Sequence, residues 1–291
     1  PWVMLKNSQT LQSIIREYNV DIVHARSRAP AWSCYWASNK TKTPYITTFH
    51  GAYGHSNRLK RWYNSVMLRG IRAIAVSDFI AKHISEIYPL YSHKVQVIHR
   101  GIDTHFFSVS KSLTSQADEL KKRWNIPKGK TIIMLPGRLT RLKGHSIFIK
   151  AISQLNTSNI FCVFVGDNHN NHSYQQELEA LIAQHNLNDI IHLVGGCENM
   201  AAAYQLADIV VSASVKPESF GRVTCEAQAM DCLVVATNHG GTKEIISSTQ
   251  QVFLCSPNDI NDMTRALNKT LEIPKNEWPL IFKESRKYIE E

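Results

Sequence analysis

The sequence predicts an α/β protein built on parallel β-sheets. Two apolar runs of strand type, residues 131–136 and 207–214, are each followed by a glycine-containing loop and then by a segment of helical composition, 145–155 and 226–230. A chain of 291 residues with 43% hydrophobic content can bury two such cores. Ligands of parallel α/β sheets bind at the loops that follow the strands, so these two loops are the first place to look for a site.

The loop after residues 207–214 contains the first of two glutamates separated by seven residues. Glu218, in the loop, can accept hydrogen bonds from sugar hydroxyls, and Glu226, in the following helix, can bind both hydroxyls of a ribose. Gly221 lacks a Cβ, so the free N–H groups at the helix start can approach an anion such as a diphosphate. The residues predicted to line this anion site are Phe220, Gly221, Arg222 and Val223. The alternative is a solvated Glu218 and a capping Glu226.

The loop after residues 131–136 carries cations beside a glycine, Gly137. Arg138 can bind phosphate oxygens through two hydrogen bonds, and Lys143 adds a point charge. Together they can neutralise the charge of a leaving nucleoside diphosphate. Arg141, in the same loop, is interpreted as a solvated residue.

Further segments recur in a fixed order, namely residues 163–167, 191–196, 199–208 and 238–244. With the Gly-Arg…Lys-Gly loop and the E-x7-E motif, this order resembles the retaining glycosyltransferases of family 4, also called glycosyltransferase group 1. The resemblance covers about residues 21–257. It implies a GT-B fold, in which two Rossmann-like domains face a cleft, here with an incomplete N-terminal domain.

The resemblance also implies roles for the site residues. In that family the first glutamate of the motif holds the donor hexose and the second binds the ribose, which by position are Glu218 and Glu226. Arg138 and Lys143 would bind the diphosphate. The loop around Gly195 would meet the nucleobase.

The N-terminal half fits the same resemblance. Residues 21–28, 47–51, 73–77 and 97–103 look like successive strand ends of an acceptor-side domain. In the family, the histidine of the Phe-His-Gly step faces the donor sugar, and here that residue is His50. The predicted catalytic residues are therefore Glu218 and His50. His169 and His172 have a spacing that suggests a metal site, but we interpret them as ordinary surface or core histidines.

The implied reaction is transfer of a hexose from a nucleotide-diphosphate sugar to an acceptor hydroxyl, with retention at the anomeric carbon. No Asp-x-Asp pair occurs in the chain. We therefore expect no metal and no other cofactor, with the loop cations and helix-start amides stabilising the departing diphosphate. One alternative is a catalytically inactive, truncated remnant that retains a nucleotide-binding domain. Another, a GT-B nucleotide-sugar epimerase, is disfavoured by the combination of the two loop motifs.

Three parts are predicted along the chain. They are a partial acceptor-side domain at 1–125, a nucleotide-sugar-binding domain at 126–275 and a helical tail at 276–291, with the boundary in the polar stretch 108–130. The first part is shorter than the 150 residues or so that a Rossmann-like half usually needs. The chain also opens with Pro1, and its last helix ends where relatives continue. We therefore expect truncation at both ends, with a first strand and its glycine-rich loop absent.

Composition favours a cytoplasmic protein. The six cysteines form no C-x-x-C pair, which is typical of reduced thiols. No apolar run approaches the ~18–20 residues of a membrane span, and no secretory signal occurs at the start.

Charge is unevenly distributed. Residues 1–125 hold 18 Lys and Arg against 7 Asp and Glu, whereas the remainder holds 15 against 17. Residues 57–69 mix cations with Trp, Tyr, Met and Leu, a pattern that can lie on an anionic membrane surface or hold an anionic acceptor. The alternative is a basic helix with one apolar face toward the core.

The acceptor is inferred from these charges and from local resemblance. No nucleic-acid motif accompanies the basic half, so a nucleic-acid partner is not expected. Residues 25–32, 63–67 and 218–222 resemble bacterial envelope enzymes, especially those of lipopolysaccharide core assembly. We expect a glycan or glycolipid acceptor and a peripheral position on the inner face of the cytoplasmic membrane.

Overall fold

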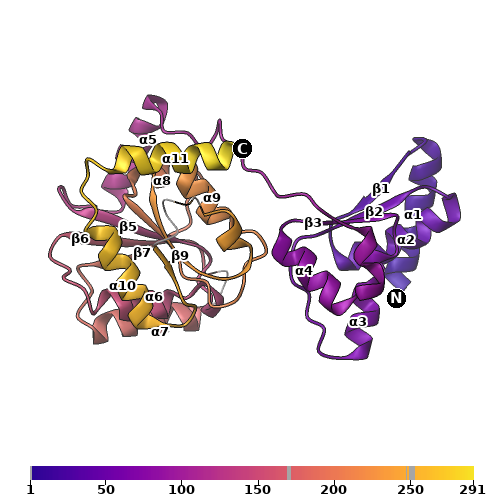
Figure 1. Cartoon of the computed structure of the whole chain (residues 1–291), viewed down its shortest axis with the longest axis horizontal. Coiled ribbons are helices and arrows are strands. Elements are labelled where there is room, and N and C mark those ends of the chain that lie inside the picture. Colours follow the sequence, from indigo (N-terminus) through magenta and orange to yellow (C-terminus); the bar gives the residue numbers. More distant parts are fainter. Residues whose placement is uncertain (1, 169–171, 247, 249–252) are drawn as a thin grey trace. The chain divides into compact units, whose positions relative to one another are not determined.

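The computed structural model describes residues 2–168, 172–246, 248 and 253–291. The chain divides into two compact units, residues 1–100 and 101–291 (Figure 1). Each unit contains one sheet whose neighbouring strands all pair in parallel. The predicted α/β class is confirmed.

The first unit has a four-stranded sheet whose spatial order is also the chain order. Its strands are β1 (Val23–Ala25), β2 (Tyr45–Phe49), β3 (Arg72–Ala75) and β4 (Val95–Val97). Its helices are α1 (Trp2–Glu17), α2 (Arg28–Thr41), α3 (Arg58–Asn64) and α4 (Asp78–Ile87), with 3₁₀ helices η1 (Ser65–Leu68) and η2 (Pro89–Lys94). All four strands overlap the segments predicted as strand ends.

The second unit has a six-stranded sheet. In spatial order its strands are β10 (Leu254–Cys255), β9 (Leu233–Thr237), β8 (Ile209–Ser212), β5 (Thr131–Pro136), β6 (Ile160–Val165) and β7 (Ile191–Gly195). Its α-helices are α5 (Lys111–Arg123), α6 (His145–Ile152), α7 (His172–Gln184), α8 (Met200–Leu206), α9 (Arg222–Ala229), α10 (Ile260–Leu271) and α11 (Trp278–Glu290). Its 3₁₀ helices are η3 (Arg141–Lys143) and η4 (Gly240–Glu244).

Strand order reverses in the middle of this sheet. From β5 the chain continues outward through β6 and β7 on one side, then returns to β8 on the other side of β5 and continues through β9 to β10. This is the doubly wound arrangement of dinucleotide-binding folds, whose ligands bind outside the carboxyl ends of the strands at the point of reversal. The loops after β5 and β8 are the two loops that the sequence singled out.

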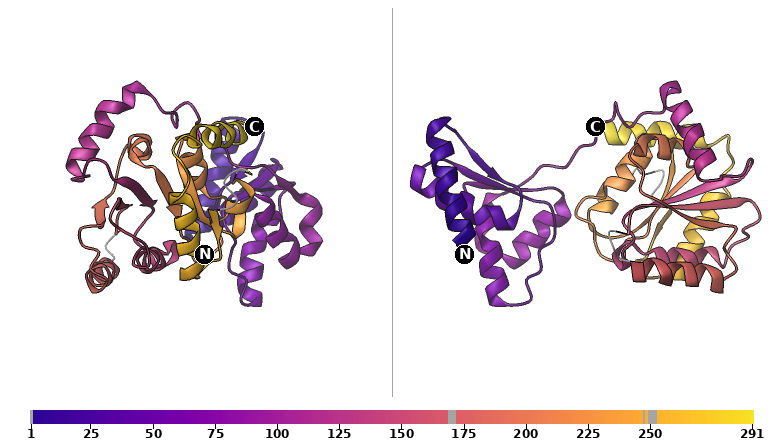
Figure 2. Two further views of the ribbon diagram at one scale, coloured as in Figure 1. Left: turned by 60° about the vertical axis from the view of Figure 1, so that its left-hand side comes forward. Right: turned by 180° about the vertical axis from the view of Figure 1, so that it is seen from behind.

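Side chains of β5 explain why the central strand reads as a continuous apolar run. Ile133 and Leu135 belong to one core cluster, whereas Ile132 and Met134 belong to another. Because successive side chains of a strand point to opposite faces, both faces of the sheet are covered. Figure 2 shows helices on both sides of it.

The domain boundary differs from the prediction. The division falls between Arg100 and Gly101, whereas the polar stretch 108–130 contains α5, which packs on α8 within the second unit. The polar residues of that stretch form the solvent face of the helix, and Leu120 and Trp124 are buried in the core. The tail at 276–291 forms α11, which packs against α9.

The basic segment 57–69 divides into two parts. Val66, Met67 and Leu68 are buried in the core of the first unit, where each contributes roughly 1.5–3 kcal/mol of hydrophobic stabilisation. By contrast Leu59 and Trp62 on α3 are 72% and 55% exposed. The end of the segment thus packs on the core, and its start presents apolar groups among cations.

Two expectations from composition can be compared with the structure. All six cysteines are free, and five of them are buried. Within the described ranges, no helix combines the length and apolar character needed to cross a bilayer.

Candidate functional site

The loops after β5 and β8 are held against each other by a glycine. Gly144 has φ +73°, and a Cβ added to it would lie 1.9 Å from the carbonyl oxygen of Ala213 at the end of β8. The N–H of Val215 donates to the carbonyl of Leu142 at 2.9 Å, which joins the two loops. Only glycine allows this approach, and it places Lys143 beside the second loop.

Glu218 and Lys143 form an ion pair at this junction. The Lys143 ammonium and the Ser214 hydroxyl both donate to Oε1 of Glu218, each at 2.5 Å. Burial raises the pKa of Glu218, but the charge and hydrogen bond of Lys143, with the bond from Ser214, outweigh it, so the pKa is lowered. The structure therefore brings together two residues that were predicted to contact different groups of the ligand, the hexose and the diphosphate, and Glu218 is ionised at neutral pH.

The chain after β9 supports the Glu218 loop from the other side. The N–H of Gly241 donates to the carbonyl of Glu218 at 2.8 Å, and a Cβ at Gly241 would lie 2.6 Å from the carbonyl oxygen of Ser219. His239 contacts the carbonyl of Ser214 through Nε2 at 2.8 Å. Burial lowers the pKa of His239, although the Ser214 bond and the Glu218 charge oppose that shift. A neutral His239 thus anchors the strand end that carries Ser214.

Glu226 is almost completely buried, with 5% exposure. The Tyr204 hydroxyl donates to Oε2 at 3.0 Å, and the Arg222 guanidinium donates to Oε1 at 2.7 and 3.1 Å. Burial, and then the Glu226 charge, raise the pKa of Tyr204 well above its ordinary value, so the phenol remains a donor. A carboxylate held in this way by two partners has a fixed orientation.

The start of α9 offers backbone donors as predicted. Gly221 is the N-cap residue, with φ +105°, and no side chain caps the helix. The first internal bond of the helix is donated by Thr224 to the carbonyl of Gly221, so the N–H groups of Arg222 and Val223 precede it. The Phe220 side chain packs with Cys225 and Ile245, so only its backbone is available to a ligand.

Arg138 and Gly195 lie at the ends of neighbouring strands. Arg138 follows β5, is exposed, and makes no ion pair or side-chain hydrogen bond with any part of the chain that the structure describes. Gly137 donates to the carbonyl of Val165, and Gly166 donates to that of Gly195. Gly195 has φ +75° and no atom within 4 Å of an added Cβ, so it borders open space. These positions suit ligand contact.

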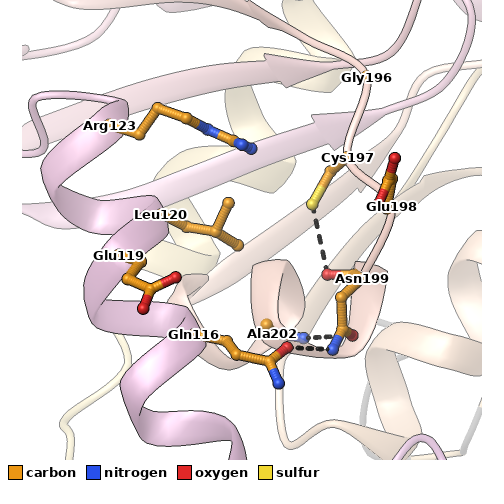
Figure 3. A pocket seen from close by; sticks show the side chains of 9 residues that line it. All are labelled: Gln116, Glu119, Leu120, Arg123, Gly196, Cys197, Glu198, Asn199 and Ala202. Carbon is orange, nitrogen blue, oxygen red and sulfur yellow. Dashed lines mark hydrogen bonds between the residues drawn. The ribbon is translucent and has the colours of Figure 1, made fainter.

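A cavity of about 550 Å³ lies between α5 and the loop after β7. Figure 3 shows Gln116, Leu120 and Arg123 projecting from α5 toward residues 196–199. Asn199 holds this loop, since it accepts from the N–H of Ala202 and donates to Gln116. The sequence prediction misses the cavity because it assigns residues 108–130 to a domain boundary.

His50 follows β2 in the first unit. Its Nε2 accepts a hydrogen bond from Nε of Arg26 at 3.3 Å, so the ring proton is on Nδ1. Burial and then the charges of Arg100, Arg26 and His24 lower the pKa of His50, which leaves it neutral at pH 7. The carboxyl edge of this sheet therefore carries cations and neutral histidines.

Arg141, His169 and His172 were not predicted to be site residues, and those of them that the structure describes are ordinary surface groups. Arg141 is exposed and forms a bidentate ion pair with Glu177, with both N–O distances 2.6 Å. His169 lies outside the described residues. His172 is 3.4 Å from Asn168, and no group of three metal-ligating side chains surrounds it among the residues that the structure describes.

Sequence reasoning missed the partners that orient the two glutamates. They are Ser214 for Glu218, with His239 bound in turn to the Ser214 carbonyl, and Tyr204 for Glu226. Ser214 ends a predicted strand, and the other two lie in segments that were quoted only for their order. Their polar character at strand or helix ends was the available signal.

The chain matches two family descriptions. Residues 116–290 match "Glycosyl transferases group 1", and residues 1–106 match "Glycosyltransferase Family 4". Because the first match covers more than half of the chain, this protein belongs to the group 1 glycosyltransferases.

Solved structures agree with this assignment. A glycosyltransferase from Rickettsia africae has a TM-score of 0.90 and 35% identity, covering 99% of this chain and 76% of that one. Anabaena HepE in complex with UDP has a TM-score of 0.86 and 21% identity, covering 98% of this chain and 76% of its own. The predicted GT-B fold class with two Rossmann-like units is confirmed.

Curated relatives are more distant. Spore coat protein SA of Bacillus subtilis is 22% identical over 82% of this chain and 66% of its own length. A lipopolysaccharide 1,2-N-acetylglucosaminetransferase of Salmonella typhimurium is 30% identical over 52% of this chain and 42% of its own. The chain spans less than two thirds of the length of the curated relatives that it matches.

Proposed function

We propose that this chain takes part in retaining transfer of a hexose from a nucleotide-diphosphate sugar to a hydroxyl of a glycan or glycolipid. The observation that carries the proposal is the Lys143–Glu218 ion pair, which joins the two loops at the point where strand order reverses. A buried, oriented Glu226 lies on the helix that leaves the second loop. HepE, which has the same fold, is described in complexes with UDP and with UDP-glucose.

The contact of each residue with the donor nucleotide sugar is assigned from the hydrogen bonds and ion pairs that the residue already makes within the protein. Arg138 has a free guanidinium for the diphosphate, and Lys143 can share its charge between that group and Glu218. Contact of Lys143 with the diphosphate leaves the ionised Glu218 free to accept from hexose hydroxyls. Glu226, held by Tyr204 and Arg222, receives the ribose hydroxyls. Gly195 borders the nucleobase.

The transfer step uses these groups electrostatically. The bond between the anomeric carbon and the diphosphate oxygen breaks, and its electron pair leaves with the diphosphate. Arg138, Lys143 and the first N–H groups of α9 stabilise that charge. The acceptor hydroxyl bonds to the same face of the sugar and passes its proton to the leaving phosphate. His50, neutral with a proton on Nδ1, acts as a hydrogen-bond donor to the donor sugar.

The acceptor and its location belong to the same proposal. The exposed Leu59 and Trp62 among the cations of α3 support binding to an anionic membrane surface, and we propose that this surface is the inner face of the cytoplasmic membrane. Lipopolysaccharide synthesis fits the relative from Salmonella. Because the protein cations neutralise the diphosphate, we expect a metal chelator to leave the transfer rate unchanged.

Release of nucleoside diphosphate from UDP- and GDP-hexoses tests this function. Arg138→Gln should reduce release about 10²-fold, since one stabilising group for the leaving charge is lost. Arg141→Gln, in the same loop, is the matched control and should leave release unchanged. Proton NMR of the product should show the anomeric configuration of the donor.

Two outcomes would contradict the proposal. Equal effects of the Arg138 and Arg141 substitutions would remove the specific role of Arg138. Nucleotide binding without release would favour the inactive remnant.

A further inference from the structure

A second cavity lies in the first unit, at the amino edge of its sheet. Its volume is about 610 Å³, and its lining includes the residues that begin or precede the strands, Tyr45 for β2, Ile71 for β3 and Lys94 for β4. His50 follows the opposite, carboxyl end of β2. The cavity is therefore separate from the edge to which the proposed function assigns a role.

The cavity lining is positively charged. Lys42, Arg69 and Lys94 line it, and no Asp or Glu does. Residues 1–100 contain 14 Lys and Arg but only four acidic residues, Glu17, Asp21, Asp78 and Glu86. No carboxylate of the lining thus balances three cations, and an anion would be attracted there.

Two of the cations are fixed in position while keeping donors free. The Arg69 guanidinium lies over the rings of Trp32 and Tyr35, at 5.0 and 5.6 Å, and within the described residues it donates one hydrogen bond, to Ser65. In the same part of the chain the Lys94 ammonium donates one, to the carbonyl of Gly70 at 2.9 Å. Since a guanidinium has five N–H donors and an ammonium three, both side chains keep donors that no described residue occupies.

Ser38 also lines the cavity, but its hydroxyl is not open to it. The residue is 3% exposed, and its hydroxyl oxygen is out of reach of water and has no hydrogen-bond partner among the described residues. The three cations are therefore the charged groups of the lining that can contact a ligand.

We infer that this cavity binds a phosphate group. Arg69 offers a planar pair of donors, and Lys42 and Lys94 offer point charges, which together suit a compact oxyanion with several acceptor oxygens. The phosphate can belong to a soluble phosphate ester or to the headgroup of an anionic lipid. The inference does not rest on the proposed transferase activity.

Calorimetric titration of the whole chain with inorganic phosphate and with glycerol 3-phosphate tests the site. The variants are Lys42→Gln and Lys94→Gln, and the matched control is Lys82→Gln, an exposed lysine on α4 that removes the same charge elsewhere. We expect saturable binding that weakens about tenfold in each site variant and not in the control. Circular dichroism of each variant confirms folding.

A vesicle arm distinguishes the sources of phosphate. The chain is mixed with phosphatidylcholine vesicles, with and without phosphatidylglycerol, and sedimented. Binding to the anionic vesicles that Lys42→Gln lowers and Lys82→Gln does not would assign a lipid headgroup, and titration by the soluble esters alone would assign a solute. Equal losses in all three variants, or no saturable binding of any of these phosphates, would overturn the inference.

Discussion

The two units share a parallel α/β architecture but differ in how charge is balanced at the carboxyl ends of their strands. In the second unit, each glutamate of the site is paired with a cation, Glu218 with Lys143 and Glu226 with Arg222. In the first unit, His50 lies among Arg26, Arg100 and His24, whose charges lower its pKa. Residues 1–100 hold 14 Lys and Arg and four Asp and Glu, whereas residues 101–291 hold 19 and 20.

This difference bears on the ligand proposed for each unit. The paired loops of the second unit hold one another in place, so the proposed donor diphosphate would exchange existing contacts at a site that is already assembled. In the first unit, no Lys or Arg forms an ion pair within the part of the chain that the structure describes, which favours an anionic ligand at either edge of its sheet. The composition reveals the excess of positive charge in the N-terminal part of the chain, but only the structure shows where in the first unit these cations lie.

The largest expected effect concerns the charge pair of the second unit. Glu218→Gln removes the carboxylate that Lys143 and Ser214 hold, and should lower sugar transfer about 10²- to 10³-fold while nucleotide affinity changes little. Steady-state kinetics with UDP- and GDP-hexoses measures this. Glu177→Gln, which breaks only the exposed pair with Arg141, is the control. Equal losses of sugar transfer in the two variants would show that the Lys143–Glu218 pair matters no more for transfer than the exposed Arg141–Glu177 pair.

The second effect is a loss of stability at acid pH that comes from the buried His145 rather than from the ion pairs of the two loops. Burial of His145 beside Phe164 lowers its pKa to about 4, although its contact with the Thr140 backbone opposes the shift. Because the folded state binds this proton less readily than the unfolded state, the stability that neutral His145 provides is lost as pH falls from 6.5 toward 4. The loss at pH 4 is about 3 kcal/mol.

Denaturant unfolding of wild type and His145→Leu at pH 7 and pH 4 measures this loss. The variant should lack that part of the acid destabilisation. An unchanged difference between the two pH values would instead assign the acid sensitivity of the second unit to other groups.

A smaller effect tests the support of Glu226. Tyr204→Phe removes the donor to a buried carboxylate oxygen and should destabilise the second unit by about 1–3 kcal/mol. Tyr288→Phe removes a bond to the Glu244 carbonyl at an exposed site, where water can replace it, and should cost less. Thermal unfolding compares them. If Tyr288→Phe proves the more damaging, burial is not what makes the Glu226 contacts important.

The smallest effect concerns the first unit. Arg26→Gln removes one of the charges that lower the pKa of His50, so that pKa should rise, although burial, the larger cause, keeps it below its ordinary value. NMR titration of the His50 ring protons measures the shift. Arg16→Gln, at the end of α1, is the control. If Arg26→Gln leaves the pKa of His50 unchanged, the charge of Arg26 does not act on His50.

Local pattern predicted the strands of the second unit closely, because buried parallel strands are apolar on both faces. The bounds of β5 coincide with the predicted run 131–136, and β8 lies within the predicted run 207–214. The loops that follow these two strands were also located, since glycine, cations and carboxylates there are local signals, and the donor site assigned to them stays a prediction. The contacts of Ser214 and Tyr204 with the glutamates are tertiary, and a sequence pattern does not contain them.

The boundary between units was predicted too late for a related reason. An amphipathic helix such as α5, with Ser, Thr, Gln and Lys on its outer face, has the composition of a linker. Ala117 and Leu120 form its buried face, which can be recognised only once α8 is known to pack against α5. Polar composition alone does not separate a linker from a surface helix.

Calorimetric titration of UDP and GDP into the chain tests the central claim most directly, with Glu226→Ala and Arg138→Ala titrated beside wild type. The account predicts saturable binding of one nucleotide that each variant weakens at least tenfold, by loss of a charged contact to the ribose or to the diphosphate. Absence of binding, or binding that neither variant changes, would contradict a donor site at the junction of the two loops.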